Sequence, residues 1–110
     1  MTVKELRTAL DLQVLSEPDP DRAVTGGYAG DLLSWVMGRA RSGDAWITVM
    51  GNVNAIAVCV LADTACLILS DASPLDDAAR ARAQAEEIPV LRSDKNTYTL
   101  AVELSRLLLS

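Results

Sequence analysis

Histidine is absent from the chain, and cysteine occurs only twice, at Cys59 and Cys66. Without histidine, the commonest general base and the commonest transition-metal ligand are both missing. Two cysteines seven positions apart, with no third soft ligand, do not make a zinc or iron–sulfur site. No serine or cysteine has a histidine to activate it, which excludes a hydrolytic triad. We therefore expect no catalytic residues, no metal site and no cofactor.

Basic residues are also few, since ten Lys and Arg stand against fifteen Asp and Glu, for a net charge of −5. Such a chain lacks the positive surface that phosphate backbones require, so we discount nucleic acid and anionic membranes as partners. The longest uncharged run, 45–62, is interrupted by Gly51, Asn52 and Asn54 and is no candidate to span a bilayer. The first residues mix charges and lack an apolar signal region, so we expect a cytoplasmic protein.

Phenylalanine is missing too, and aliphatic residues supply most of the 50 % hydrophobic content. Short strand-like segments alternate with longer helix-like ones, which is typical of a mostly parallel sheet with helices packed on it. We predict a single α/β domain over residues 1–110 with a sheet of four to five strands. The expected strands are 13–15, a piece beginning at Val24, 45–50, 66–69 and 88–91, and the expected helices are 3–10, 32–41, 53–62, 74–87 and 95–108.

The segment 53–62 fits two interpretations. Ile56, Val58 and Val60 alternate as in a strand, yet the part from Ala55 to Ala62 is apolar on every side, as in a buried helix. Two parallel strands at 46–50 and 66–69 need a crossover connection of about this length, which favours the helix.

Capping signals predict where several helices begin. Thr2 and Glu5 have the spacing of a capping box. Asp31 and Asp94 are placed to cap two further helices, and Pro74 suits the first position of another.

The segment 21–27 resembles the signature of the DRTGG family, whose positions are matched by Asp21, Arg22, Thr25, Gly26 and Gly27. Later segments also resemble the family's pattern, in the same order along the chain. They are Gly43-Asp44 before the strand 45–48, the strand 66–69, and Ile88-Pro89-Val90-Leu91, with Glu87 where glycine is usual. The resemblance covers roughly residues 20–108.

The resemblance implies a small α/β module that regulates and does not catalyse. The family is similar to the N-terminal domain of the kinase that phosphorylates the sugar-transport phosphocarrier protein. It also accompanies catalytic domains in phosphotransacetylases and in CBS-domain pyrophosphatases. Stand-alone members occur beside hydrogenase and redox-sensing genes in anaerobes, so the resemblance implies a redox or hydrogenase context.

Thr25, Gly26, Gly27 and Tyr28 are the first candidate ligand-binding residues. A glycine-rich segment before a helix lets backbone N–H groups approach a phosphate or carboxylate, although Asp31 would repel an anion there. The alternative is a tight strand-to-helix turn that needs glycine for backbone reasons.

Thr48, Gly51, Asn52 and Asn54 are the second candidate group, at the carboxyl end of the strongest predicted strand. Ligands bind at that edge in open α/β sheets, and these polar, uncharged side chains suit a small ligand. The alternative is that the two asparagines only cap the helix that follows.

We expect a regulatory or small-ligand-sensing module, and the alternative is a pure dimerisation or protein-interaction module with a protein partner. A homodimer is predicted from 55–62, because a helix without polar side chains is normally buried on all sides. A second copy of the same helix would cover its outer face. The competing explanation is that 55–62 is a central strand inside a monomer.

Overall fold

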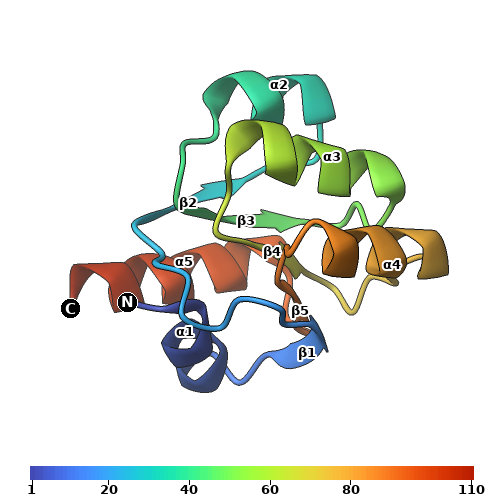
Figure 1. Ribbon diagram of the computed structural model, residues 1–110. Coiled ribbons are helices and arrows are strands. Elements are labelled where there is room, and N and C mark those ends of the chain that lie inside the picture. The colour runs from blue at the N-terminus through green and yellow to red at the C-terminus, as the bar shows by residue number, and fades with distance from the viewer.

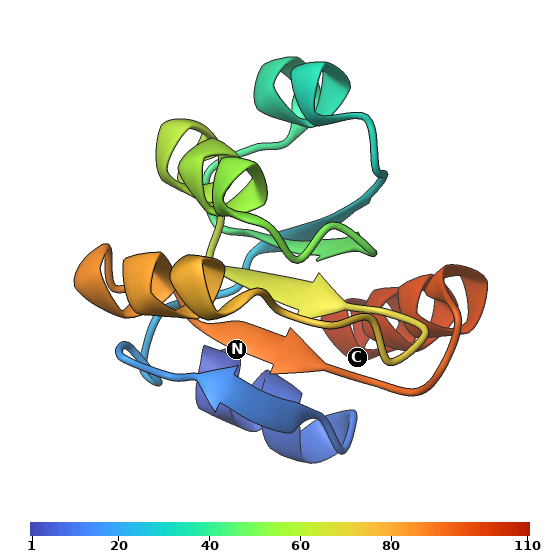
Figure 2. The same ribbon diagram turned by 90° about the vertical axis from the view of Figure 1, so that its right-hand side faces the viewer.

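A five-stranded sheet lies between two layers of helices in the computed structural model, which describes residues 1–110 (Figure 1). The strand order is β1-β5-β4-β3-β2. All neighbours are parallel except β1, which pairs antiparallel with β5 and points against the other strands in Figure 2. The strands are β1 (Gln13–Ser16), β2 (Gly26–Ala29), β3 (Asp44–Thr48), β4 (Cys66–Leu69) and β5 (Val90–Arg92).

Five helices cover the two faces of the sheet. Helices α2, α3 and α4 lie on one face, and α1 and α5 lie on the other (Figure 1). Their bounds are α1 (Val3–Ala9), α2 (Leu33–Arg39), α3 (Val53–Ala62), α4 (Asp77–Ala85) and α5 (Thr97–Leu109). The predicted α/β class, the mostly parallel sheet and the helical reading of 53–62 are confirmed, and the central-strand alternative is wrong.

Each face of the sheet has its own core, because successive side chains of a strand point to opposite faces. Trp46 of β3 is fully buried under α2 and α3, and its indole N–H donates to the carbonyl of Gly30 at 2.9 Å. Its neighbours Ala45 and Ile47 are buried on the other side, with Leu100 and Leu104 of α5. The apolar run of β3 is thus explained by burial on both faces.

Two of the predicted helix starts are correct, and three are wrong. Thr2 and Glu5 form the capping box, and Asn52 caps α3. Asp31 does not cap α2, because its carboxylate instead accepts from Thr48 and from the backbone N–H of Val49.

Helix α4 begins after Pro74, because hydrogen bonds tie the segment before it to the loops that follow β3 and β4. The Ser73 hydroxyl donates to the carbonyl of Ser70, and the Asp76 N–H donates to the carbonyl of Gly51. The last helix is capped by Asn96 rather than Asp94.

Gly26 and Gly27 were expected in a turn or at a helix N-terminus, and both lie in the strand β2 instead. Close packing explains the two glycines. A Cβ at Gly26 would lie 2.6 Å from Oδ1 of Asp44, and one at Gly27 would lie 2.7 Å from Cδ2 of Leu104. Side chains from the neighbouring strand and from α5 occupy the space on both faces of β2.

Helix α3, which is apolar from Ala55 to Ala62, packs against α2, α4 and the sheet, yet it keeps an outer face. Ile56 and Cys59 are fully buried, whereas Val60 is 41 % and Leu61 is 70 % exposed. None of the five helices has the length and apolarity needed to cross a membrane.

Candidate functional site

The two groups of candidate residues lie at different places along the strands. Thr25–Tyr28 form most of β2, with Gly26 beside Asp44, the first residue of β3. Thr48 is the last residue of β3, and Gly51, Asn52 and Asn54 follow it. The structure therefore does not bring the two groups together into one site.

The group at the carboxyl end of β3 is occupied by internal contacts. The buried Thr48 hydroxyl donates to Oδ1 of Asp31 at 2.8 Å. Gly51 lies directly against the backbone carbonyl of Pro74. Oδ1 of Asn52 accepts from the N–H of Ala55 at 2.9 Å, and Asn54 is exposed in the first turn of α3. None of the three hollows in the surface is lined by the four candidates of this group.

Arg22 of the family signature holds together the turns at the amino end of the sheet. Its guanidinium donates to the carboxylate of Asp63 at 2.9 Å and to the Asp63 carbonyl at 3.0 Å. Ser42 donates to the same carboxylate from the turn before β3. The hydrogen bond from Ser42, and then that from Arg22, lower the pKa of Asp63. The turn after α2 and the turn after α3 are thus tied to the chain that enters β2.

A polar hollow of about 480 Å³ lies on one face of β2, next to these turns. We call it the Arg39–Arg41 hollow. Its lining comes from β2, from the end of α2 and from the turn before β3, and consists of Thr25, Gly26, Gly27, Tyr28, Arg39, Arg41, Ser42 and Asp44. The first of the two candidate groups therefore lines a hollow together with two arginines.

The two arginines of this hollow have no carboxylate partner. The three ion pairs of the molecule use Arg7, Arg22 and Lys95. The Arg39 guanidinium stacks on the Trp35 ring at 3.6 Å. The backbone N–H of Arg41 donates to the buried Asp44 carboxylate at 2.8 Å. Two exposed guanidinium groups beside the Thr25 hydroxyl suit a small anion such as a phosphate or carboxylate.

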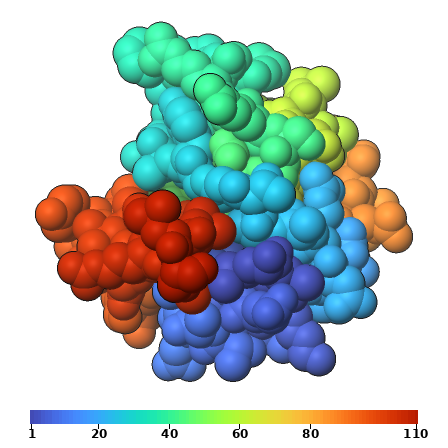
Figure 3. All heavy atoms as spheres, turned by 90° about the vertical axis from the view of Figure 1, so that its left-hand side faces the viewer, coloured from blue at the N-terminus to red at the C-terminus, as the bar shows by residue number.

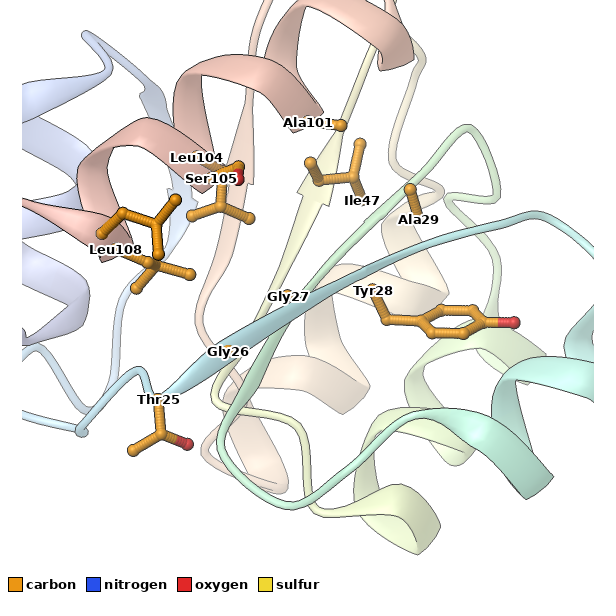
Figure 4. Close-up of a pocket in the computed structure, with 11 residues that line it drawn as sticks. Thr25, Gly26, Gly27, Tyr28, Ala29, Ile47, Ala101, Leu104, Ser105 and Leu108 are labelled. Carbon is orange, nitrogen blue, oxygen red and sulfur yellow. The ribbon is translucent and has the colours of Figure 1, made fainter.

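The other face of β2 borders an apolar groove of about 420 Å³ beneath α5, which we call the α5 groove. In Figure 4 the side chains of α5 lie on one side of β2, and the Tyr28 ring points away from them. The groove is lined by Thr25, Gly26, Gly27, Tyr28, Ala29, Ile47, Ala101, Leu104, Ser105, Leu108 and Leu109. It contains no charged side chain.

Sequence reasoning missed the arginines, because Arg39 and Arg41 were interpreted only as favourable residues at the end of a helix. The sequence did contain a signal for a positively charged site, because Arg39 and Arg41 stand shortly before Gly43 and the strand that follows it. The turn with Gly43, whose φ is +85°, brings this segment against Thr25. Nothing in the sequence of α5 indicated that this helix would line a groove, because its leucines match the pattern of an ordinary core stripe.

The two cysteines lie in the interior, away from both hollows. Burial raises the pKa of the Cys59 thiol to about 11. Burial, followed by the neighbouring Cys59, also raises the pKa of Cys66. Both are free thiols, and such protonated, enclosed groups are unsuited to thiolate chemistry.

The fold and the hollow define the class of protein. It is an α/β module with two arginines beside an edge strand. The sequence matches the model of the DRTGG domain over residues 5–107, so the chain belongs to the DRTGG domain family. No curated protein matches the sequence.

One solved structure shares the fold over nearly the whole chain. It contains the CBS and DRTGG domains of the regulatory region of Clostridium perfringens pyrophosphatase, complexed with its activator diadenosine tetraphosphate. The TM-score is 0.67 at 13 % identity, and the match covers 98 % of this chain but only 46 % of that one. At this identity the likeness establishes the fold.

Proposed function

We propose that this chain is a non-catalytic regulatory module that binds a small anionic ligand in the Arg39–Arg41 hollow. The observation that carries the proposal is the pair of arginines without carboxylate partners, in a chain whose net charge is −5. Hydrogen bonds to a charged group contribute about 1.5–3 kcal/mol each. Thr25 supplies a hydroxyl, and the one carboxylate in the lining, that of Asp44, already accepts from the backbone N–H of Arg41.

The ligand class is narrowed by the chemistry of the hollow. Arginine forms paired hydrogen bonds with phosphate and carboxylate groups. The regulatory region of the clostridial pyrophosphatase is complexed with a dinucleotide that carries four phosphates. We therefore favour a phosphorylated metabolite or nucleotide over a neutral one.

Thermal unfolding against a ligand panel tests the proposal, because a ligand that binds only the folded state raises Tm. The panel contains inorganic phosphate, nucleoside mono-, di- and triphosphates, and diadenosine tetraphosphate. We expect at least one phosphorylated compound to raise Tm by several degrees at about 100 times its Kd. Arg41→Gln should weaken that binding about 10- to 100-fold, whereas Arg82→Gln on the exposed face of α4 should not change it. Equal binding by both variants would contradict the proposed site.

A second candidate function is a pure protein-interaction module. It is favoured by the large apolar side chains that α2 and α3 expose, since such patches on soluble proteins often mark contact sites. They include Trp35 at 53 %, Met37 at 47 % and Leu61 at 70 % exposure. If no compound of the panel raises Tm and the chain still assembles, this function replaces the first one.

The context in redox or hydrogenase metabolism rests on the family resemblance alone. If it holds, we infer that the chain reports on a bound ligand rather than on its own thiols. The reason is that Cys59 and Cys66 are enclosed in the interior and that burial raises the pKa of both.

A further inference from the structure

The outer side of β2 is an open sheet edge with none of the usual protection. Strand β2 pairs only with β3, at one end of the sheet. Soluble proteins normally guard such an edge with a charged side chain, a proline, a bulge or a covering element. The segment 25–30 contains no charged residue and no proline, and it pairs with β3 without a bulge. In Figure 3 the strand crosses the surface beside α5 with nothing over it.

The backbone of β2 has free hydrogen-bonding groups on this side. The N–H of Gly30, just after the strand, donates to the carbonyl of Ile47 at 3.1 Å, so it points toward β3. Peptide groups of alternate residues in an extended strand point to the same side, so Gly26 and Tyr28 also face β3. The N–H and C=O groups of Gly27 and Ala29 therefore point outward, and they offer two donors and two acceptors to a further strand.

A second copy of β2 can satisfy all of these groups at once. In an antiparallel pair, residues that face each other as a hydrogen-bonded pair exchange two bonds. If Gly27 faces Ala29 of the second copy, symmetry repeats the pair, and every outward group is used. The two-fold axis then passes between the two Tyr28 residues, which face each other as a non-hydrogen-bonded pair. Such a cross-strand pair of aromatic rings stabilises the pairing.

The same axis covers the α5 groove. A two-fold axis perpendicular to the sheet leaves α5 of both copies on the same face, side by side above the joined strands. The exposed face of α5 that overhangs β2 carries Ala101, Ser105, Leu108 and Leu109, without a charge. Leu109 is 85 % exposed in one copy. Small side chains at 101 and 105 allow two helices to approach closely, and the leucines of the partner fill the groove.

Charge complementarity favours a second copy over an unrelated strand. Arg41 and Ser42 lie at the amino end of β2, and the exposed Asp31 follows its carboxyl end. Antiparallel pairing brings the carboxyl end of one β2 to the amino end of the other. Asp31 of each copy then lies at the same end as Arg41 of its partner, and the contact is made twice.

From these observations we infer that two copies of this chain join edge to edge through β2, as an antiparallel pair centred on Tyr28, with α5 packed on α5. The pair forms one continuous sheet. The joining needs no anionic ligand, so this inference and the proposed function can fail separately. It also differs from the dimer predicted from the sequence, because the contact lies at the free edge of β2 and not on the helix 55–62.

A single cysteine at the axis tests the register. Tyr28 faces Tyr28 of the second copy as a non-hydrogen-bonded pair, with Cα atoms about 4.5 Å apart, and this separation suits a disulfide. The native Cys59 and Cys66 are buried and do not interfere. The variant Tyr28→Cys should form a reducible covalent dimer under mild oxidation, and Ala29→Cys, which faces Gly27 of the second copy, should not.

Sedimentation equilibrium on two matched variants locates the contact. Ser105→Glu places a carboxylate at the expected α5–α5 contact, and Leu61→Glu places one on the exposed face of α3; both positions are exposed helix positions, and circular dichroism checks the fold. We expect a wild-type dimer at tens of micromolar, a monomer for Ser105→Glu and a dimer for Leu61→Glu. A wild-type monomer at that concentration would overturn the inference. A dimer lost in Leu61→Glu, or kept in Ser105→Glu, would also overturn it, as would a Tyr28→Cys variant that does not cross-link.

Discussion

The two edges of the sheet are built differently. At one edge, β1 pairs antiparallel with β5, has an irregular register between Val14 and Ser16, and runs into a segment with two prolines. Arg7 of α1 forms an ion pair with Glu17, the residue that follows the strand, at 2.6 Å. At the other edge, β2 is regular, uncharged and rich in glycine.

The difference indicates which edge is available for further pairing. A bulge, a nearby charge and prolines all discourage an added strand, and β1 has the three together. β2 has none of them, and hollows lie on both of its faces. The family signature therefore lies at the one edge where both the proposed ligand and the proposed second copy can reach the backbone.

The largest loss of stability is expected from a substitution at Leu15, which packs β1, the protected edge strand, onto the core. Leu15 of β1 is 7 % exposed and belongs to the core beneath α4. Leu15→Ala should lower the free energy of unfolding by about 2–5 kcal/mol, because it leaves a cavity. Denaturant unfolding measures this loss. Val14→Ala, on the exposed side of the same strand, should cost less than about 1 kcal/mol, and equal losses would show that β1 is not anchored from one face.

The next effect concerns the second glycine of the open edge. Gly27→Val forces a side chain against Leu104, and we expect the free energy of unfolding to fall by about 1–3 kcal/mol through overpacking. Ala29→Val, on the same face of β2 but exposed, is the matched control, with a change within about 0.5 kcal/mol. If Gly27→Val is harmless, close packing with α5 does not explain the glycine.

A smaller effect is expected from the ion pair that protects β1. Arg7 and Glu17 are partly buried, with 27 % and 17 % of their side chains exposed. Arg7→Gln should lower the free energy of unfolding by about 1 kcal/mol. Lys4→Gln on the exposed surface of α1 is the control, because Lys4 has no ion pair. Unfolding in high salt should reduce the difference between the two variants only slightly, since partly buried pairs are weakly screened.

The smallest effect concerns Asp63, which ties Arg22 and Ser42 to the amino end of the sheet. Its pKa is lowered in the folded state, so its contribution to stability is present above its ordinary pKa of about 3.9. That contribution is lost as the pH falls through the lower, folded-state value. The carboxylate is largely exposed, so we expect less than about 1 kcal/mol. The stability difference between wild type and Asp63→Asn should therefore be present at pH 7 and shrink below pH 4; a constant difference would contradict this.

Sequence reasoning predicted the fold well, and of its two candidate groups of ligand-binding residues only the first lines a hollow in the surface. The alternation of apolar segments determines the α/β class, because burial on one or both faces sets the pattern of each element. The crossover argument for 53–62 succeeded because parallel strands require such a connection. The signature glycines were expected in a turn before a helix, since glycines usually mark turns. They lie in a strand instead, where Asp44 and Leu104 leave no room for a side chain at either position, and such tertiary contacts leave no local pattern.

The asymmetry of the two edges is tested most directly by hydrogen exchange of backbone amides, measured by NMR at several protein concentrations. An amide that becomes bonded between two copies exchanges more slowly as the dimer population rises. We predict that the Gly27 and Ala29 amides become protected between low and high micromolar concentrations, while the amides of β1 exchange at constant rates. Unchanged exchange at Gly27 and Ala29, or protection that appears at β1 instead, would contradict the account.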